Sequence, residues 1–134
     1  MQDIAIYHQT GVAAAAAAFI LFLSLLVADV AGVIAKKTPG DIAKADHSSF
    51  LFRSNRALGN MNESIAIFII FALIGILSGA DAKWLAYFAW VYVGARFAYL
   101  FCYWLNIKLV RSLCFGISLI GLGGMGYVMV RGFL

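Results

Sequence analysis

Four long apolar stretches dominate this sequence, at about residues 12–35, 57–79, 84–105 and 112–131. Each is close to the roughly 20 residues that a helix needs to cross the hydrocarbon core of a bilayer. The apolar runs are continuous and do not alternate with polar residues, which favours membrane helices over the strands of a barrel. Only 12% of the 134 residues are charged, against roughly 25% in soluble domains. The sequence therefore predicts an all-α, four-transmembrane-helix bundle that forms one integral membrane domain over residues 1–134.

The first apolar stretch also has one feature of a secretory signal, because "VADVA" at 27–31 offers small residues for cleavage. Residues 1–11 nevertheless contain no Lys or Arg and do contain Asp3. The apolar run is also longer than the core of a signal peptide. We expect the first helix to be retained.

The distribution of basic residues predicts the orientation in the membrane. One side carries most of them: Lys36, Lys37, Lys44, Arg53, Arg56, Lys108 and Arg111. The other side has Lys83 and Arg131. The positive-inside rule then places both termini outside and the 1–2 and 3–4 loops in the cytoplasm. The net charge of +4 is mostly this topology signal, and no basic soluble face exists for nucleic acid. Because the chain has little beyond its helices, we expect a bacterial inner membrane.

The two cysteines, Cys102 and Cys114, lie within apolar helices and have no CxxC or Cys/His cluster near them. Free thiols commonly act as small apolar side chains in such positions. We therefore expect structural cysteines and no metal site.

Polar side chains recur at helical spacing on two of the predicted helices. The second helix carries four of them within about 80° of one face: Arg53, Arg56, Asn60 and Glu63. The third helix carries four within about 60°: Tyr92, Arg96, Tyr99 and Tyr103. Each helix thus has one polar face, and the remaining surface is apolar.

The depths of two charges in the membrane match. At 1.5 Å per residue, Glu63 and Arg96 each lie about 15 Å from the cytoplasmic ends of their helices. An isolated charge at the bilayer centre costs at least about 2.5–3.5 kcal/mol, so pairing is favoured. We predict a Glu63–Arg96 ion pair near mid-membrane, in a register that also brings Asn60 level with Tyr99. This pair could serve only to hold the bundle together, or it could belong to a ligand site.

Arginines near the cytoplasmic end, namely Arg53, Arg56 and Arg111, outnumber the available carboxylates. Part of this surplus is explained by two general properties of membrane proteins: arginine side chains at helix ends extend to the membrane surface, and cytoplasmic loops are enriched in basic residues. The rest suggests an anionic small molecule with carboxylates, held beside an apolar co-substrate that is dissolved in lipid. Asp29, inside the first helix, either pairs with an arginine of the second helix or is a protonated packing residue.

The segment "RSNRALGNMNE" at 53–63 resembles the Arg-x-x-Arg-Ala-x-x-Asn-x-x-Glu signature of the MAPEG family, the membrane-associated proteins of eicosanoid and glutathione metabolism. "VYVGARFAYLFCYW" resembles the third helix of that family, and "VRSL" resembles the start of its fourth helix. The resemblance covers about residues 29–120. Two departures are Leu58, where relatives often have His or Gln, and the missing proline shortly after Glu63.

The resemblance implies a homotrimer that binds glutathione between adjacent subunits near the cytoplasmic face. It implies that glutathione is contacted or supported by the polar faces: Arg53, Arg56, Asn60, Glu63, Arg96, Tyr99 and Tyr103. Arg111 would activate the thiol, with Ser112 beside it. A guanidinium cannot act as a base in practice, so its role would be to stabilise the thiolate electrostatically.

The predicted function is that of a membrane glutathione transferase, or a peroxidase-like enzyme, which acts on lipophilic electrophiles or lipid hydroperoxides. One alternative is a non-catalytic MAPEG-fold protein that binds lipid or acts as a scaffold. Another is a small multidrug exporter, in which Glu63 alone would couple transport to protons; the surplus arginines argue against this class.

Overall fold

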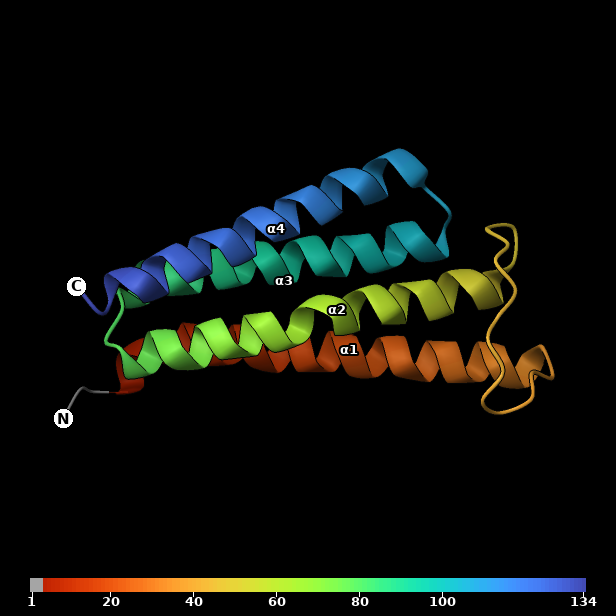
Figure 1. Ribbon diagram of the computed structural model, residues 1–134, viewed down its shortest axis with the longest axis horizontal. Helices are drawn as coiled ribbons and strands as arrows, with labels where there is room; N and C mark the ends of the chain where they lie inside the picture. Colours follow the sequence, from red (N-terminus) through yellow and green to blue (C-terminus); the bar gives the residue numbers. More distant parts are fainter. Residues whose placement is uncertain (1–3) are drawn as a thin grey trace.

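The computed structural model describes residues 4–134, and most of them lie in four long α-helices (Figure 1). A short 3-10 helix, η1 (Ile4–Tyr7), leads directly into the first of them. The helices are α1 (His8–Ile34), α2 (Phe50–Leu77), α3 (Ala82–Trp104) and α4 (Lys108–Arg131). All four are long and apolar enough to cross a membrane. The predicted four-helix transmembrane bundle is thus confirmed, and the protein is an integral membrane protein.

The helices run up and down in sequence order, so that both termini lie at one end of the bundle (Figure 1). We call this the termini end; it also contains the tight turn between α2 and α3, where Gly79 adopts a φ of 72°. The opposite end, here the loop end, contains the long segment between α1 and α2 and the short link from α3 to α4 (Figure 1). The polar residues singled out from the sequence belong to the loop-end halves of α2, α3 and α4.

Helices α3 and α4 approach each other very closely. A Cβ atom added at Gly121 would lie 2.7 Å from the backbone nitrogen of Tyr92 and 3.1 Å from the carbonyl oxygen of Phe88. Only a residue without a side chain allows two helix backbones to come this near. This contact fixes the position of the α3 polar face relative to α4.

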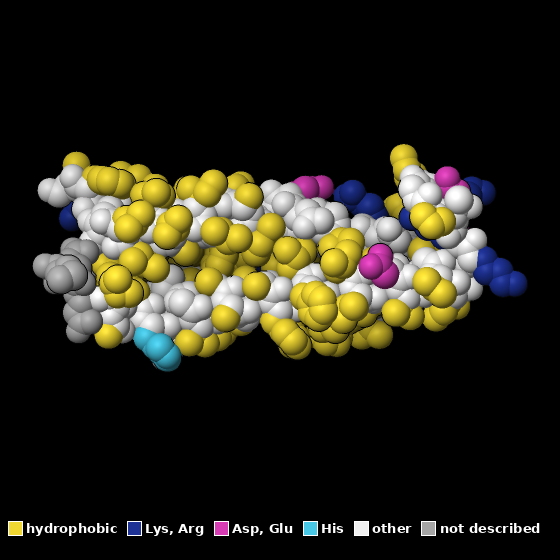
Figure 2. Space-filling model, turned by 90° about the horizontal axis from the view of Figure 1, so that it is seen from below, with side chains coloured by type: hydrophobic (Ala, Val, Ile, Leu, Met, Phe, Trp, Pro, Cys, Tyr) yellow, Lys and Arg dark blue, Asp and Glu magenta, His cyan; other side chains and the backbone are white. Residues whose placement is uncertain are grey.

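The surface is largely apolar along the bundle (Figure 2). Large hydrophobic side chains such as Phe19, Ile70 and Leu119 are exposed on the outside of the helices. Lys and Arg side chains gather mainly at the loop end of this face (Figure 2). A broad apolar band with charges at its ends is the surface expected of a protein that is surrounded by lipid.

Helix α2 begins at Phe50, well before the apolar stretch that starts near residue 57. Its first two turns carry Arg53, Asn55 and Arg56, yet they remain helical. These turns lie at the loop end, where the helix leaves the apolar band. Polar residues there extend the helix and place the arginines at the level of the site described next.

Candidate functional site

A small cavity with polar walls lies at the loop end between α2, α3 and α4. It has a volume of about 280 Å³ and is lined by Asn60, Tyr99, Tyr103, Arg111, Ser112 and Phe115. All but Phe115 are residues that the sequence had predicted for the site. Helix α3 contributes the two tyrosines, which are one helical interval of four residues apart and both buried. The fold therefore brings parts of the three polar segments together around one space.

Arg111 supplies the charge that is nearest to this space. Its guanidinium carbon lies 4.4 Å from the centre of the Tyr103 ring. This is cation–π geometry, which holds the group without neutralising it. The Nη1 atom of Arg111 is buried and has no hydrogen-bond partner. Ser112, the next residue, is exposed, and its hydroxyl donates to the carbonyl oxygen of Lys108 at 3.2 Å.

Arg96 lies deeper, behind Tyr99, and is only 2% exposed. Its guanidinium is surrounded by the rings of Tyr92, Tyr99 and Phe115, at 5.6, 5.3 and 5.3 Å from their centres. Its Nη2 donates to the hydroxyl of Ser64 at 2.9 Å. The Nε and Nη1 atoms are buried without a partner. Arg96 is thus a positive charge held among aromatic rings with one hydrogen bond.

The predicted ion pair between Glu63 and Arg96 is wrong within the protomer. Glu63 is exposed on the surface of α2, and within residues 4–134 no carboxylate pairs with Arg96. Ser64 takes that position instead, and its hydroxyl also shares a 2.8 Å hydrogen bond with the hydroxyl of Tyr92. The depth was predicted correctly, but α2 is turned by one residue, or about 100°, from the orientation expected.

The other predicted charges lie around the cavity in different ways. Arg53 donates from Nη1 to the carbonyl oxygens of His47 and Ser48, both at 2.8 Å, and from Nε to that of Trp104 at 3.2 Å. It therefore joins the long loop to the end of α3. Arg56 is exposed and lines a neighbouring cavity of about 300 Å³ that also contains Asp41.

Three guanidiniums lie in or near this space: that of Arg111 lines the cavity, that of Arg96 lies against the Tyr99 ring, and that of Arg56 lines the neighbouring cavity. No ion pair neutralises any of these groups in the part of the chain that the structure describes. The cavity is therefore a strongly cationic space with tyrosine hydroxyls and the Asn60 amide as hydrogen-bonding groups. Such a space suits an anionic small molecule, for example one with carboxylates.

The long loop between α1 and α2 reaches this site. The His47 ring stacks on the Tyr103 ring with 6.4 Å between centres. Just before it, the Asp46 carboxylate accepts hydrogen bonds from the Ser48 amide at 2.9 Å and from the Ser48 hydroxyl. These bonds from Ser48 hold the pKa of Asp46 below its usual range. The loop is thus ordered by local bonds where it passes the cavity.

Two contributors, Ser64 and Phe115, were not predicted from the sequence. Ser64 is four residues after Asn60, so helical spacing alone could have placed it on the same face. Phe115 is four residues after Arg111 in α4 and had the same signal. Neither residue carries a charge, and a serine or a phenylalanine in an apolar helix is common, so spacing alone did not distinguish them from packing residues.

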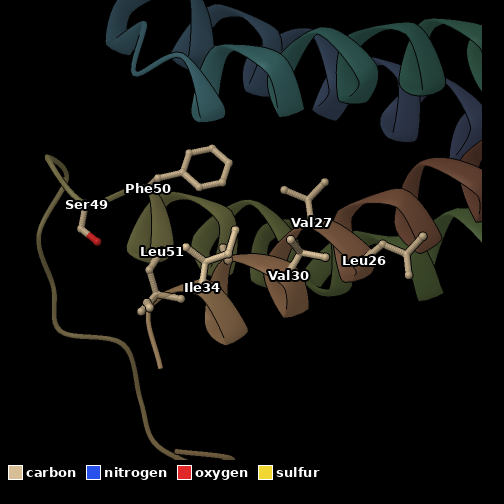
Figure 3. A pocket seen from close by; sticks show the side chains of 9 residues that line it. Leu26, Val27, Val30, Ile34, Ser49, Phe50 and Leu51 are labelled. Atoms are coloured by element: carbon tan, nitrogen blue, oxygen red, sulfur yellow. The ribbon is translucent and has the colours of Figure 1, made fainter. Parts of the chain in front are cut away.

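A second groove at the loop end has no polar chemistry. It lies between the end of α1 and the start of α2, with Leu26, Val27, Val30 and Ile34 from one helix and Ser49, Phe50 and Leu51 from the other (Figure 3). Its volume is about 390 Å³. The lining is apolar except for the Ser49 hydroxyl, so this groove suits a hydrocarbon chain and offers no reactive group.

Comparison with known proteins agrees with this arrangement. The profile of the MAPEG family matches residues 10–131, which include all four helices almost to their ends. Searches of curated proteins and of solved structures found no match. The matched range contains every residue of the cavity, and the four-helix architecture agrees with it. The chain therefore belongs to the MAPEG family.

Proposed function

We propose that this member of the MAPEG family, whose proteins act in eicosanoid and glutathione metabolism, joins the glutathione thiolate to lipophilic electrophiles or uses it to reduce lipid hydroperoxides. One observation carries the proposal: the Arg111 guanidinium lines a cationic cavity and has a buried Nη1 without a partner. No carboxylate within residues 4–134 neutralises the Arg111 guanidinium where it lines the cavity, so its charge can act on a ligand there, and a thiolate is the anion that the family chemistry supplies.

The physical basis is the protonation of the thiol. A free thiol has a pKa near 8.5 and is mostly protonated at neutral pH. A guanidinium within about 4–6 Å favours the charged form and lowers that pKa by about 1–3 units. Arg111 would therefore raise the fraction of thiolate without taking the proton itself, which leaves to water. In transfer, the sulfur attacks the electrophilic carbon and the leaving group departs with the bonding electrons.

The other groups would bind the rest of the tripeptide. A carboxylate of glutathione would meet the exposed positive charge of Arg56, while the buried Arg96 would act on the ligand only through its charge, from behind Tyr99. The Asn60 amide and the tyrosine hydroxyls would hydrogen-bond to the peptide groups. Arg53 already binds three carbonyl oxygens, so we assign it to support of the loop beside the ligand. Ser112 would lie beside the thiolate, where its hydroxyl offers a further donor.

We include a homotrimer in this proposal, because the Glu63 side chain is exposed on the surface of α2 in the protomer. An exposed carboxylate in the middle of a membrane helix needs a partner that lipid does not provide. In a trimer with glutathione between subunits, Glu63 would lie against the next protomer, where the ammonium group of glutathione is a suitable partner. The protomer alone thus supplies the thiolate-stabilising side of the site, and Glu63 would complete it in the assembly.

The test is an ultraviolet absorbance titration of thiolate with glutathione on purified protein at neutral pH. We expect a thiolate signal with the wild type and a loss of at least about tenfold with Arg111→Ala, as a shift of one pKa unit implies. Arg131→Ala is the matched control, because it removes an arginine from the other end of α4 and should leave the signal unchanged. A wild type without any thiolate signal would rule out the transferase proposal.

The apolar groove between α1 and α2 favours one second candidate, a protein that binds lipid without catalysis. That candidate predicts retained lipid binding, no conjugation and no response to Arg111→Ala. An exporter would instead lose transport on substitution of Glu63 alone and would not need Arg111. The same set of variants therefore separates the three functions.

A further inference from the structure

A separate cavity at the termini end has no part in the proposed chemistry. It lies between the start of α3 and the end of α4, far from Arg111 along the bundle, and has a volume of about 590 Å³. It is lined by Gly79, Asp81, Trp84, Phe88, Tyr127, Val128, Arg131 and Gly132. It is larger than the cationic cavity at the loop end, and it contains one negative and one positive side chain.

These two charges line the same cavity without forming an ion pair. The Asp81 carboxylate caps α3, and its Oδ1 accepts a hydrogen bond from the Trp84 amide at 3.0 Å. The second oxygen of Asp81, Oδ2, accepts no hydrogen bond from residues 4–134. Arg131 is exposed at the last turn of α4, and its guanidinium has no carboxylate within ion-pair distance in that same range. The cavity thus has in its wall one anionic oxygen and one cation that are not paired with each other.

The walls of the cavity are aromatic and well supported. Trp84 and Tyr127 are 49% and 67% exposed, and both lie near the ends of membrane helices, where such rings prefer the interface between lipid and water. Phe88 packs directly on Gly124, where an added Cβ would overlap its ring. A Cβ on Gly132 would lie 2.9 Å from the Ala80 amide nitrogen, so the end of α4 rests on the α2–α3 turn. Two parts of the cavity wall, at Phe88 and at Gly132, are therefore fixed in place by close packing.

We propose that this cavity binds the zwitterionic headgroup of a membrane phospholipid. The phosphate would bind the Arg131 guanidinium, and the ammonium group would bind Oδ2 of Asp81. The acyl chains would run along Trp84 and Tyr127 into the apolar band. A lipid with a purely anionic headgroup would also satisfy Arg131, but it would bring a negative charge towards the Asp81 carboxylate and leave that carboxylate unpaired. The geometry therefore selects a zwitterion over an anion.

The test compares phosphatidylethanolamine with phosphatidylglycerol as probes, by native mass spectrometry of the purified protein. We expect the wild type to bind phosphatidylethanolamine about tenfold more tightly, which corresponds to about 1.4 kcal/mol. Asp81→Asn should reduce this ratio to about one while the protein stays folded, because Asn caps helices as well as Asp does. Arg131→Gln should weaken the binding of both lipids. Lys83→Gln is the control, because Lys83 lies at the same end outside the cavity and should change neither.

Three results would overturn the proposal. The first is equal affinity of the wild type for the two lipids. The second is a loss of binding in Lys83→Gln as large as that in Arg131→Gln, since this would indicate a general attraction of anionic groups. The third is that water-soluble glycerophosphoethanolamine binds as tightly as the diacyl lipid. This would show that the cavity binds a soluble zwitterion and not a membrane lipid.

Discussion

A guanidinium group has five N–H donors, and Arg96 satisfies few of them within the protomer. One nitrogen bonds to Ser64, two others are buried without a partner, and three aromatic rings surround the group. Aromatic faces attract a cation, but they do not replace the hydrogen-bond acceptors that the remaining N–H groups lack. The stability of this region therefore depends strongly on the one hydroxyl that both Arg96 and Tyr92 contact.

Replacement of that hydroxyl should be costly. In Ser64→Ala, Arg96 and Tyr92 both lose their hydrogen-bond partner in a buried place, and we expect the protein to lose about 1–3 kcal/mol of stability. Thermal unfolding in detergent measures the change. Ser24→Ala is the matched control, because Ser24 is equally buried but bonds only to the carbonyl oxygen of Ile20 in its own helix. If both variants lose the same stability, the network around Arg96 has no special role.

The sequence predicted the residues of this network better than their pairing. The spacing of Tyr92, Arg96, Tyr99 and Tyr103 correctly predicted one buried face on α3. Charge complementarity then favoured Glu63 as the partner of Arg96, because two charges at one depth should pair. The rotation of α2 about its axis decides whether Glu63 or Ser64 faces Arg96. That rotation depends on buried apolar residues such as Ala57 and Met61, which have no charge from which a partner could be predicted.

At the scale of the elements, the α3–α4 pair determines the geometry of both cavities. The close approach at Gly121 lies between them along the two helices. A change in the spacing of these helices would alter the distance from Tyr103 to Arg111 at one end and from Asp81 to Arg131 at the other. Two unrelated sites thus depend on one glycine contact.

Gly121→Ala should therefore destabilise the bundle by about 1–3 kcal/mol, the range for overpacking, because the added Cβ meets backbone atoms that cannot rotate away. Gly123→Ala is the control on the same helix, since nothing lies within 4 Å of its added Cβ. Alanine is the better helix former, so that variant should be neutral or slightly more stable. Circular dichroism melting of both variants compares them. A Gly121 variant as stable as the Gly123 variant would contradict close backbone packing.

The existence of four helices could be predicted from apolar length alone, whereas the early start of α2 followed only from the helical spacing of Arg53 and Arg56. Hydropathy places the start of a helix where the apolar band begins, but hydrogen bonding continues the helix through Arg53 and Arg56 to Phe50. The close approach of α3 and α4 could not be predicted from the sequence, because α4 contains several glycines and only some of them lie close to a neighbouring helix.

For the whole molecule, two exposed acidic side chains in the membrane helices need an explanation. Glu63 and Asp29 both lie on the outer surface, and neither has an arginine partner in the described part of the chain. The alternative in which Asp29 pairs with an arginine of α2 is thus not found in the protomer. Figure 2 shows acidic side chains on the surface beside hydrophobic ones. A charged side chain in these positions costs free energy in lipid, and the trimer that we propose would lower this cost by covering the side chain with another copy of the chain.

We expect native mass spectrometry to show a trimer of the wild type and at least a tenfold larger share of monomer in Glu63→Gln, because a shift of about 1.4 kcal/mol is sufficient for this. Asp29→Asn would show whether the second carboxylate also lies in the interface. Asp41→Asn, in the exposed loop, is the control and should leave the trimer intact. A wild type that remains monomeric in lipid nanodiscs would contradict the assembly. A single protomer sequence does not encode such contacts in any periodic pattern, which is why only family resemblance pointed to them.

The three hydrogen bonds of Arg53 have a consequence for motion. They fasten the loop at His47 and Ser48 to the end of α3, so those residues cannot swing away while the bonds hold. The part of the loop before Asp46, where Gly40 has a φ of 89° and follows Pro39, has no bond to Arg53. Arg53 therefore divides this loop into a part next to α2 that is bound in place and a part next to α1 that is not bound by Arg53. We expect the larger movements of the loop in the part next to α1.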